Sequence, residues 1–175
     1  SGLRLTGRFV YIQLRPLSSK AVTLHVDVQT QGKHMYRFSL SSMYKSVRMR
    51  LGKVAEIPLA LPRRWTLLAL DTHRLLELVT QGHTRGQQLQ FVRAVKLCCS
   101  MAVRGVWTSD IAYTPGTLYK DLALHVPRGA TFGDSYAFLW TPAPPSGAEH
   151  KYASALSAQM ALDSQALSAD LHSTA

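Results

Sequence analysis

The basic side chains are the residues of this sequence best able to do chemistry, because the usual catalytic motifs are missing from it. There is no glycine-rich phosphate loop, no G-x-S-x-G nucleophile motif and no H-E-x-x-H metal motif. Cys98 and Cys99 are neighbours in the chain, which disfavours a disulfide between them, and no spacing of cysteine and histidine matches a zinc site. We therefore predict a non-enzymatic protein with no catalytic, cofactor-binding or metal-binding residues.

The seven histidines and the acidic residues of the turns offer weaker alternatives. His25 and His125 fall on the polar side of alternating segments, which is typical of surface histidines. Asp110 follows a serine and Asp134 follows a glycine, and a lone aspartate in such a dipeptide usually shapes a turn. Cys98 and Cys99 are expected to point to opposite faces of one strand, one of them into the core.

The strongest compositional signal is positive charge. The chain has 20 basic and 10 acidic residues, a net charge of +10 and a pI near 10.0. Residues 1–142 hold 19 of the basic residues and only 7 of the acidic ones. A small domain with this excess is expected to bind a polyanion, which is a nucleic acid, an anionic membrane or an acidic protein surface. Charge alone does not choose among the three.

The basic residues gather in two stretches. One runs from residue 45 to residue 64, and the other lies between residues 93 and 104. Because so few acids are available to neutralise them, we predict a binding surface rather than a solvated face. The candidate residues are Lys45, Arg48, Arg50, Lys53, Arg63 and Arg64 in the first stretch, and Arg93, Lys96 and Arg104 in the second.

The opening stretch 5–28, LTGRFVYIQLRPLSSKAVTLHVDV, predicts two strands. Val10, Ile12 and Leu14 alternate with more polar residues, as a half-buried strand requires, and the same period of two returns over residues 22–28. The polar stretch 16–20 between them is a turn. Two such strands joined by about five residues are most simply an antiparallel pair.

The remaining chain predicts a further series of short strands. Alternating or apolar runs cover residues 35–40, 47–51, 57–61, 65–70, a long segment 89–103, then 106–113, 122–126 and 136–140. One convincing helix spans residues 73–80 or 73–81, with Asp71 or Thr72 as its cap and Gly82 as its stop. Residues 83–88 form a polar loop. This pattern predicts an all-β, antiparallel β-sandwich of jelly-roll type with one short α-helix.

Composition divides the chain near residue 142. Residues 1–142 form the predicted sandwich domain, and residues 143–175 are a low-complexity tail or linker rich in proline, alanine and serine. Such a tail indicates that the chain is part of a larger protein. No apolar run approaches the roughly 18 residues of a membrane span, and the start SGLRLTGR does not resemble a signal peptide. We expect an intracellular protein in a reducing compartment, without membrane contact.

Several motifs together resemble the cilia- and flagella-associated protein 20 domain family, especially its centriolar branch. They are LTGR, LRPL, RFSLSSMYK, RRWTLLALD and VRGVWTSD, and the likeness covers residues 3–140 in the same order. The resemblance implies a non-catalytic β-sandwich on the wall of tubulin microtubules. Such a domain bridges adjacent tubules at the inner junction or links centriolar triplets to inner-scaffold proteins. It implies a cytoplasmic, cytoskeletal location at the centriole, basal body or axoneme, and a longer chain with WD repeats.

This implication gives the basic residues a role in binding tubulin, and bridging two tubules requires two basic patches, one from each stretch. A nucleic-acid-binding β-domain is the main alternative, with Tyr44, Trp65 and Trp107 as stacking platforms. It is disfavoured because these aromatics are not interleaved with the basic residues. A carbohydrate-binding or hydrolytic jelly roll is less favoured still, because paired carboxylates are scarce.

Overall fold

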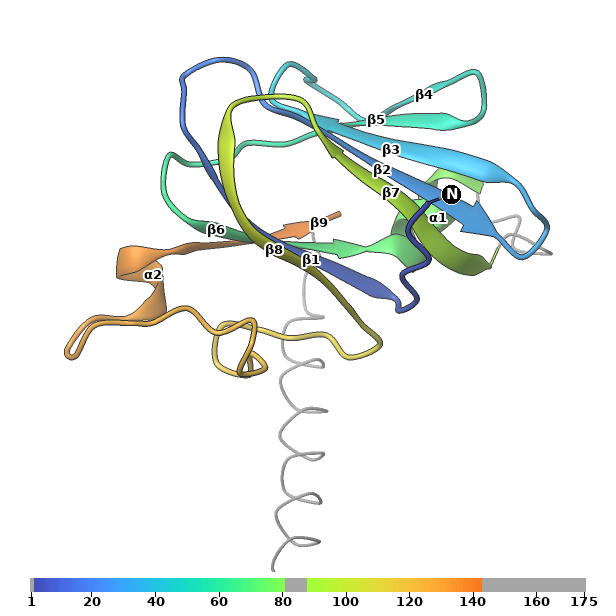
Figure 1. The fold of residues 1–175 in the computed structure, drawn as a ribbon. Coiled ribbons are helices and arrows are strands. Elements are labelled where there is room, and N and C mark those ends of the chain that lie inside the picture. Colours follow the sequence, from blue (N-terminus) through green and yellow to red (C-terminus); the bar gives the residue numbers. More distant parts are fainter. Residues whose placement is uncertain (1, 81–87, 143–175) are drawn as a thin grey trace, which may run out of the picture. The chain divides into compact units, whose positions relative to one another are not determined.

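Nine strands form two β-sheets in the computed structural model, which describes residues 2–80 and 88–142 (Figure 1). The four-stranded sheet has the order β8-β1-β6-β9, and the five-stranded sheet has the order β4-β5-β3-β2-β7. The strands are β1 (Phe9–Pro16), β2 (Thr23–Thr30), β3 (Met35–Ser41), β4 (Arg48–Arg50), β5 (Val54–Pro58), β6 (Thr66–Asp71), β7 (Leu89–Leu97), β8 (Met101–Ser109) and β9 (Ala137–Thr141). The predicted all-β sandwich is confirmed.

The core lies between the two sheets and is built from alternate residues of their strands. Val10, Ile12 and Leu14 of β1 face the core from the four-stranded sheet, and the five-stranded sheet contributes the matching apolar faces of β2 and β3. Most of these side chains are fully buried. The period of two in the sequence therefore identified the core correctly. The sheets are mixed, however, since β3 pairs with β5 and β6 pairs with β9 in parallel.

The predicted antiparallel pair of β1 with β2 is wrong. β1 pairs with β6 and β8, whereas β2 pairs with β3 and β7 in the opposite sheet. Residues 17–22 cross from one layer to the other, a gap of about 10 Å that a few extended residues span. Proline and serine in this segment suit such a crossing as well as a hairpin, and the tight Asn-Gly or Asp-Gly signal of a two-residue hairpin is absent.

Strand β1 is buried on both faces, although its sequence pattern predicts one exposed face. Phe9, Tyr11 and Gln13 point away from the main core, yet each is almost inaccessible to solvent. Residues 110–136, beneath the four-stranded sheet in Figure 1, cover Tyr11 and Gln13. The Tyr11 hydroxyl donates to the Ile111 carbonyl at 3.1 Å and accepts the Tyr113 N–H at 2.6 Å. This cover forms a second apolar layer, and burial raises the pKa of Tyr11.

Aromatic side chains fill much of this second layer. Phe9 and Tyr11 contact Trp140 of β9 edge to face, with ring centroids 5.6 and 6.4 Å apart. Leu122 is nearly fully buried, and its carbonyl accepts a hydrogen bond from the Gln13 side-chain amide. Residues 122–126 therefore belong to the cover, and the strand predicted there is wrong. Three alternating apolar residues are too short a pattern to distinguish an edge strand from a loop packed on a sheet.

The long strand predicted over residues 89–103 is two strands in different sheets. β7 ends at Leu97 and β8 begins at Met101, with a corner between them. Leu97 and Met101 both pack against the same core, so the apolar alternation continues through the corner and hides it. Cys98 is exposed and Cys99 half-buried at this corner, which corrects their predicted positions on opposite faces of a strand.

Two helices complete the described residues. The first, α1 (Thr72–Thr80), matches the predicted helix, and Asp71 caps it by accepting the Arg74 N–H at 3.2 Å. The predicted stop Gly82 and loop residues 83–87 lie outside the described residues. The second, α2 (Phe132–Ser135), is a single turn that was not predicted, although Thr131 and Asp134 form a capping box around it. In the described parts of the chain, no helix is long and apolar enough to span a membrane.

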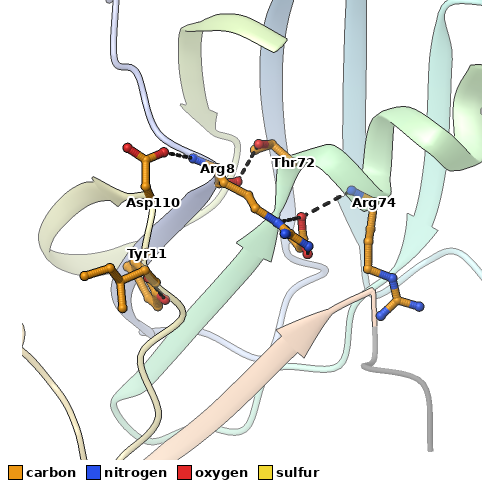
Figure 2. Close-up of polar contacts among 7 residues, drawn as sticks. Arg8, Tyr11, Thr72, Arg74 and Asp110 are labelled. Carbon is orange, nitrogen blue, oxygen red and sulfur yellow. Dashed lines mark hydrogen bonds and ion pairs between the residues drawn. The ribbon is translucent and has the colours of Figure 1, made fainter. Parts of the chain in front are cut away.

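A cluster around Arg8 joins three distant segments at one end of β1 (Figure 2). The Arg8 guanidinium donates to both carboxylate oxygens of Asp71, at 3.1 and 2.7 Å, while its main-chain N–H donates to Asp110 at 3.1 Å. Thr72 donates to the Arg8 carbonyl through its N–H at 3.0 Å and its hydroxyl at 2.5 Å. We call Arg8, Asp71, Thr72 and Asp110 the Arg8 cluster.

Gly7 makes the close approach of these segments possible. Its φ of +122° is rarely adopted by other residues, and a Cβ at this position would lie 3.0 Å from the Ser109 main-chain nitrogen. The segment before β1 therefore lies directly against the end of β8.

We expect the Asp71→Ala variant to lose about 3 kcal/mol of stability. The substitution leaves the Arg8 guanidinium without its nearly buried partner and removes the cap of α1. Urea unfolding followed by tryptophan fluorescence measures the loss. The matched control is Asp121→Ala, at an exposed aspartate, which we expect to change stability by no more than about 0.5 kcal/mol. Equal effects of the two substitutions would contradict a structural role for the Arg8 cluster.

Candidate polyanion-binding surface

The outer face of the five-stranded sheet gathers basic residues from both sequence stretches. Residues that alternate with the core positions of β2 and β3 point to this face, and the register of β4 and β7 adds theirs. We call this surface the basic face. Its charged residues are Arg37, Arg48, Arg50, Arg93 and Lys96, with Asp27 and Glu56 as the acids.

Asp27 is the electrostatic centre of the basic face. Its carboxylate accepts two hydrogen bonds from the Arg37 guanidinium, at 2.6 and 2.8 Å, and lies 3.3 Å from the Lys96 ammonium. The hydrogen bonds from Arg37 hold the pKa of Asp27 below its usual value, although burial acts against them, and Asp27 in turn raises the pKa of Arg37. The centre of the face is therefore a fixed ion-pair network across β3, β2 and β7.

The rim of the basic face carries cations with fewer partners. Arg50 forms an ion pair with Glu56 at 3.2 Å, and its side chain remains 71% exposed. Among the described residues, Arg48 donates only to the Ser46 hydroxyl, at 3.3 Å. Lys45 and Lys53 are exposed on either side of β4 and form no ion pair with any residue in the described ranges. Lys45, Arg48 and Lys53 are therefore free to bind an external anion.

The opposite edge of the basic face holds a cavity of about 250 Å³ beside the N-terminal segment. Arg4, Phe91 and Arg93 line it, and the Arg4 guanidinium lies 5.8 Å from the centre of the Phe91 ring. Arg93 donates to the Met35 sulfur at 3.7 Å. Positive charge therefore extends across the whole sheet, from β4 to the segment beside β7.

Three of the predicted site residues, Arg63, Arg64 and Arg104, lie outside the basic face. The two sequence stretches therefore do not correspond to two separate patches on the surface. Arg63 and Arg64 belong to the connection between the sheets, and Arg64 donates to the carbonyl of Gly133 at 2.8 Å. Arg104 lies on β8 and donates to Gln13 at 3.0 Å and to the Ala123 carbonyl at 2.7 Å, which fastens the cover of the other sheet. Arg93 and Arg104 were grouped because residues 89–103 were predicted to form one strand. The corner after Leu97 divides this segment, so that Arg93 lies on β7 and Arg104 on β8.

Sequence reasoning did not include Arg37 or Arg4 among the candidate residues. Arg37 could have been found, because it alternates with the core residues Tyr36 and Phe38 and so had to point outward. The position of Arg4 depends on a backbone bridge between Leu5 and Val92, which no local pattern indicates. Within residues 2–80 and 88–142, no group of three or more His, Cys, Asp or Glu residues is arranged to hold a metal ion.

Comparison with known proteins connects this sandwich to a family. The model of the CFA20 domain matches residues 1–126, which is well over half of the chain. The chain belongs to the CFA20 domain family. The resemblance seen in the sequence motifs is thereby confirmed.

Curated relatives of this CFA20 domain are much longer proteins. Centriole proteome protein 16 of Chlamydomonas reinhardtii is 33% identical over 148 residues, which cover 83% of this chain and 7% of that protein. WD repeat-containing protein 90 is 28% identical in both Mus musculus and Homo sapiens, over 168 and 167 residues, which cover 80% of this chain and 9% of each protein. The chain therefore spans less than a tenth of the length of these relatives.

Three of the motifs that carry the resemblance meet in the Arg8 cluster, whereas RFSLSSMYK contributes Arg37 and Lys45 to the basic face and its rim. Arg8 comes from LTGR, Asp71 from LALD and Asp110 from WTSD. In VRGVW, Gly105 lies against the Trp107 ring, since a Cβ there would be 2.4 Å from a ring carbon. LTGR, LALD, WTSD and VRGVW therefore contribute structural contacts of the four-stranded sheet and its ends.

His25 is the titratable group of the basic face that responds near neutral pH. It faces Ser39 and Lys96 across the sheet, and its Nδ1 is inaccessible to solvent and has no hydrogen-bond partner in the described part of the chain. Burial lowers the pKa of His25, and the charge of Arg37 acts in the same direction, opposed by Asp27 and supported by Lys96. Protonation of His25 therefore disfavours the folded CFA20 domain.

We expect the His25→Asn variant to lose less stability than the wild type when the pH falls from 7.5 to 5.5. Because the pKa of His25 is lowered in the folded state, the unfolded chain takes up the proton first, at about pH 6.5, and stability falls below that pH. Asp27 does not contribute in this window, since its stabilisation is lost only below about pH 4.

Urea midpoints at the two pH values measure the effect. His34→Asn, at an exposed histidine of the β2–β3 turn, is the matched control. An unchanged pH dependence in His25→Asn would show that His25 is not its source.

Proposed function

We propose that this chain is a non-catalytic structural module of centrioles or cilia that binds microtubules through its basic face. The observation that supports this most is the open outer face of the five-stranded sheet, where five basic residues face only two acids. Tubulin presents an acidic outer surface, and electrostatic complementarity of this kind guides association and register. The outer face of the other sheet is covered by residues 110–136, so its strands are not available for such a contact.

The cellular setting in this proposal comes from the relatives. One of them is named as a centriole protein, and others are named for WD repeats. The chain matches only a small part of each. We therefore propose a domain at residues 1–142 within a longer cytoskeletal protein, with residues 143–175 as a linker to further domains.

Bridging requires a second contact besides the basic face. The exposed residues Lys120 and Arg128 lie in the cover of the four-stranded sheet, which is on the opposite side of the sandwich from the basic face (Figure 1). We propose that this side contacts a second tubule at an inner junction or a protein of the inner scaffold. In this arrangement the basic face binds one lattice, and the cover segment faces its neighbour.

Nucleic acid is a weaker candidate partner because the predicted stacking residues do not share one surface. Tyr44 lies by the basic face and bonds to the Ser39 hydroxyl at 3.0 Å. Trp65 lies under the Arg15 guanidinium of the other sheet, and Trp107 packs on Gly105 of β8. Proteins that bind single strands use rows of aromatics inside a basic groove, and the basic face has no such row among its described residues.

We expect the double variant Lys45→Glu, Lys53→Glu to bind microtubules roughly tenfold more weakly than the wild type at low salt. Both side chains are exposed and form no ion pair with a described residue, so their reversal changes the surface charge without breaking an internal ion pair. Raising the salt concentration should reduce this difference, because charges beyond about 8 Å are screened at physiological ionic strength. Co-sedimentation at several salt concentrations measures both effects.

The matched control is the double variant Lys120→Glu, Arg128→Glu, which changes the net charge equally on the covered side. We expect it to retain binding to single microtubules and to reduce bundling. Arg48 and Arg50 are unsuitable for charge reversal, because a glutamate at either position would face Glu56. Equal loss of lattice binding in the two double variants would mean that net charge, and not the basic face, controls attachment.

A further inference from the structure

Leu51 is the most exposed large apolar residue among those described. It lies at the tip of the β4–β5 hairpin, and 96% of its surface is accessible to solvent. The neighbouring Gly52 also has open space around it, since a Cβ built there would meet no atom within 4 Å. Leu51 therefore contributes nothing to the core of the domain.

The backbone at Leu51 is unfavourable for a leucine. The Lys53 N–H donates to the Arg50 carbonyl at 3.1 Å, and the two residues between them have positive φ angles, 51° at Leu51 and 60° at Gly52. This is a type I′ turn, whose first central position favours asparagine, aspartate or glycine. A leucine in the left-handed region is destabilising, because its Cβ approaches the following carbonyl.

The surroundings of Leu51 are positively charged. Arg50 and Lys53 flank the turn, and Arg48 lies two residues before Arg50, on the same face of β4. Glu56 is the nearest acid across the hairpin, where it pairs with Arg50. The hairpin thus presents one apolar side chain within a ring of cations.

We infer that Leu51 is an apolar anchor that enters a pocket on an acidic protein surface while the flanking cations bind carboxylates around that pocket. No contact within the described domain offsets the backbone strain and the exposure of Leu51. A partner that covers the Leu51 side chain would account for both. This inference deepens the proposed function and rests on it, because the microtubule lattice is then the acidic surface. Leu51 supplies the part of the attachment that salt does not screen.

A membrane is the less fitting partner for this hairpin. Leu51 is the single apolar residue at its tip, because the exposed Met43 and Val47 precede β4 at the other end of that strand. Even a whole myristoyl chain gives only weak, reversible attachment to a bilayer, so one leucine would add little. A protein pocket can enclose one leucine completely and discriminate its shape.

The Leu51→Asn variant of the full 175-residue chain tests this inference, because the two expected changes have opposite signs. Asparagine suits the left-handed turn, so we expect Tm to rise by about 2–4 °C. Loss of one buried leucine corresponds to roughly tenfold weaker binding to microtubules. The weakening should persist at high salt, unlike that of the charge-reversal variant.

The matched control is Leu17→Asn, at a leucine that is 59% exposed in the β1–β2 connection, and we expect it to bind like the wild type. If the wild type binds microtubules and Leu51→Asn binds them equally well, the anchor is overturned and the proposed function stands. A lower Tm in Leu51→Asn would instead make Leu51 a structural residue. Failure of the wild type itself to sediment with microtubules would reject the proposed function and the anchor together. Binding to phosphatidylserine vesicles that is lost in Leu51→Asn would replace the acidic protein by a membrane.

Discussion

The burial of β1 on both of its faces is the constraint on which the rest of the structure depends. Val10, Ile12 and Leu14 point into the core between the sheets, and Phe9 and Tyr11 point into the aromatic layer behind them. The described part of the chain supplies that second layer with residues 110–136 as a cover. The outer face of the five-stranded sheet is instead lined by polar and charged residues, with Arg37, Asp27 and Lys96 at its centre.

Electrostatics then organise the open face from its centre outward. Asp27 neutralises the middle of the sheet, where the like charges of Arg37 and Lys96 would otherwise repel each other across β2. The cations without ion pairs are displaced toward the hairpin containing β4, on one side, and toward Arg4 and Arg93, on the other. Attraction to a polyanion is strongest at these rims, whereas the centre provides a rigid platform with little net charge.

Sequence patterns predicted the features that follow from local alternation of apolar and polar residues. They did not reveal the features that follow from which strands pair with each other. The core faces, the helix capped by Asp71 and the outward direction of Arg48 and Arg50 all follow from a period that a few neighbouring residues define. The crossing after β1 and the corner at Cys98 were mispredicted, because a chain passing between layers keeps its apolar face toward the same core. The grouping of Arg93 with Arg104 failed for this reason.

The Arg8 cluster separates residues that hold the fold from cations on the rim of the basic face. LTGR, LALD and WTSD meet in this cluster, whereas RFSLSSMYK contributes Arg37 and Lys45 to the basic face and its rim. The exposed rim cations Arg48 and Lys53 lie outside the Arg8 cluster, and surface substitutions usually change stability by no more than about 0.5 kcal/mol. Substitutions at these rim positions can therefore alter what the surface binds while the sandwich itself is kept.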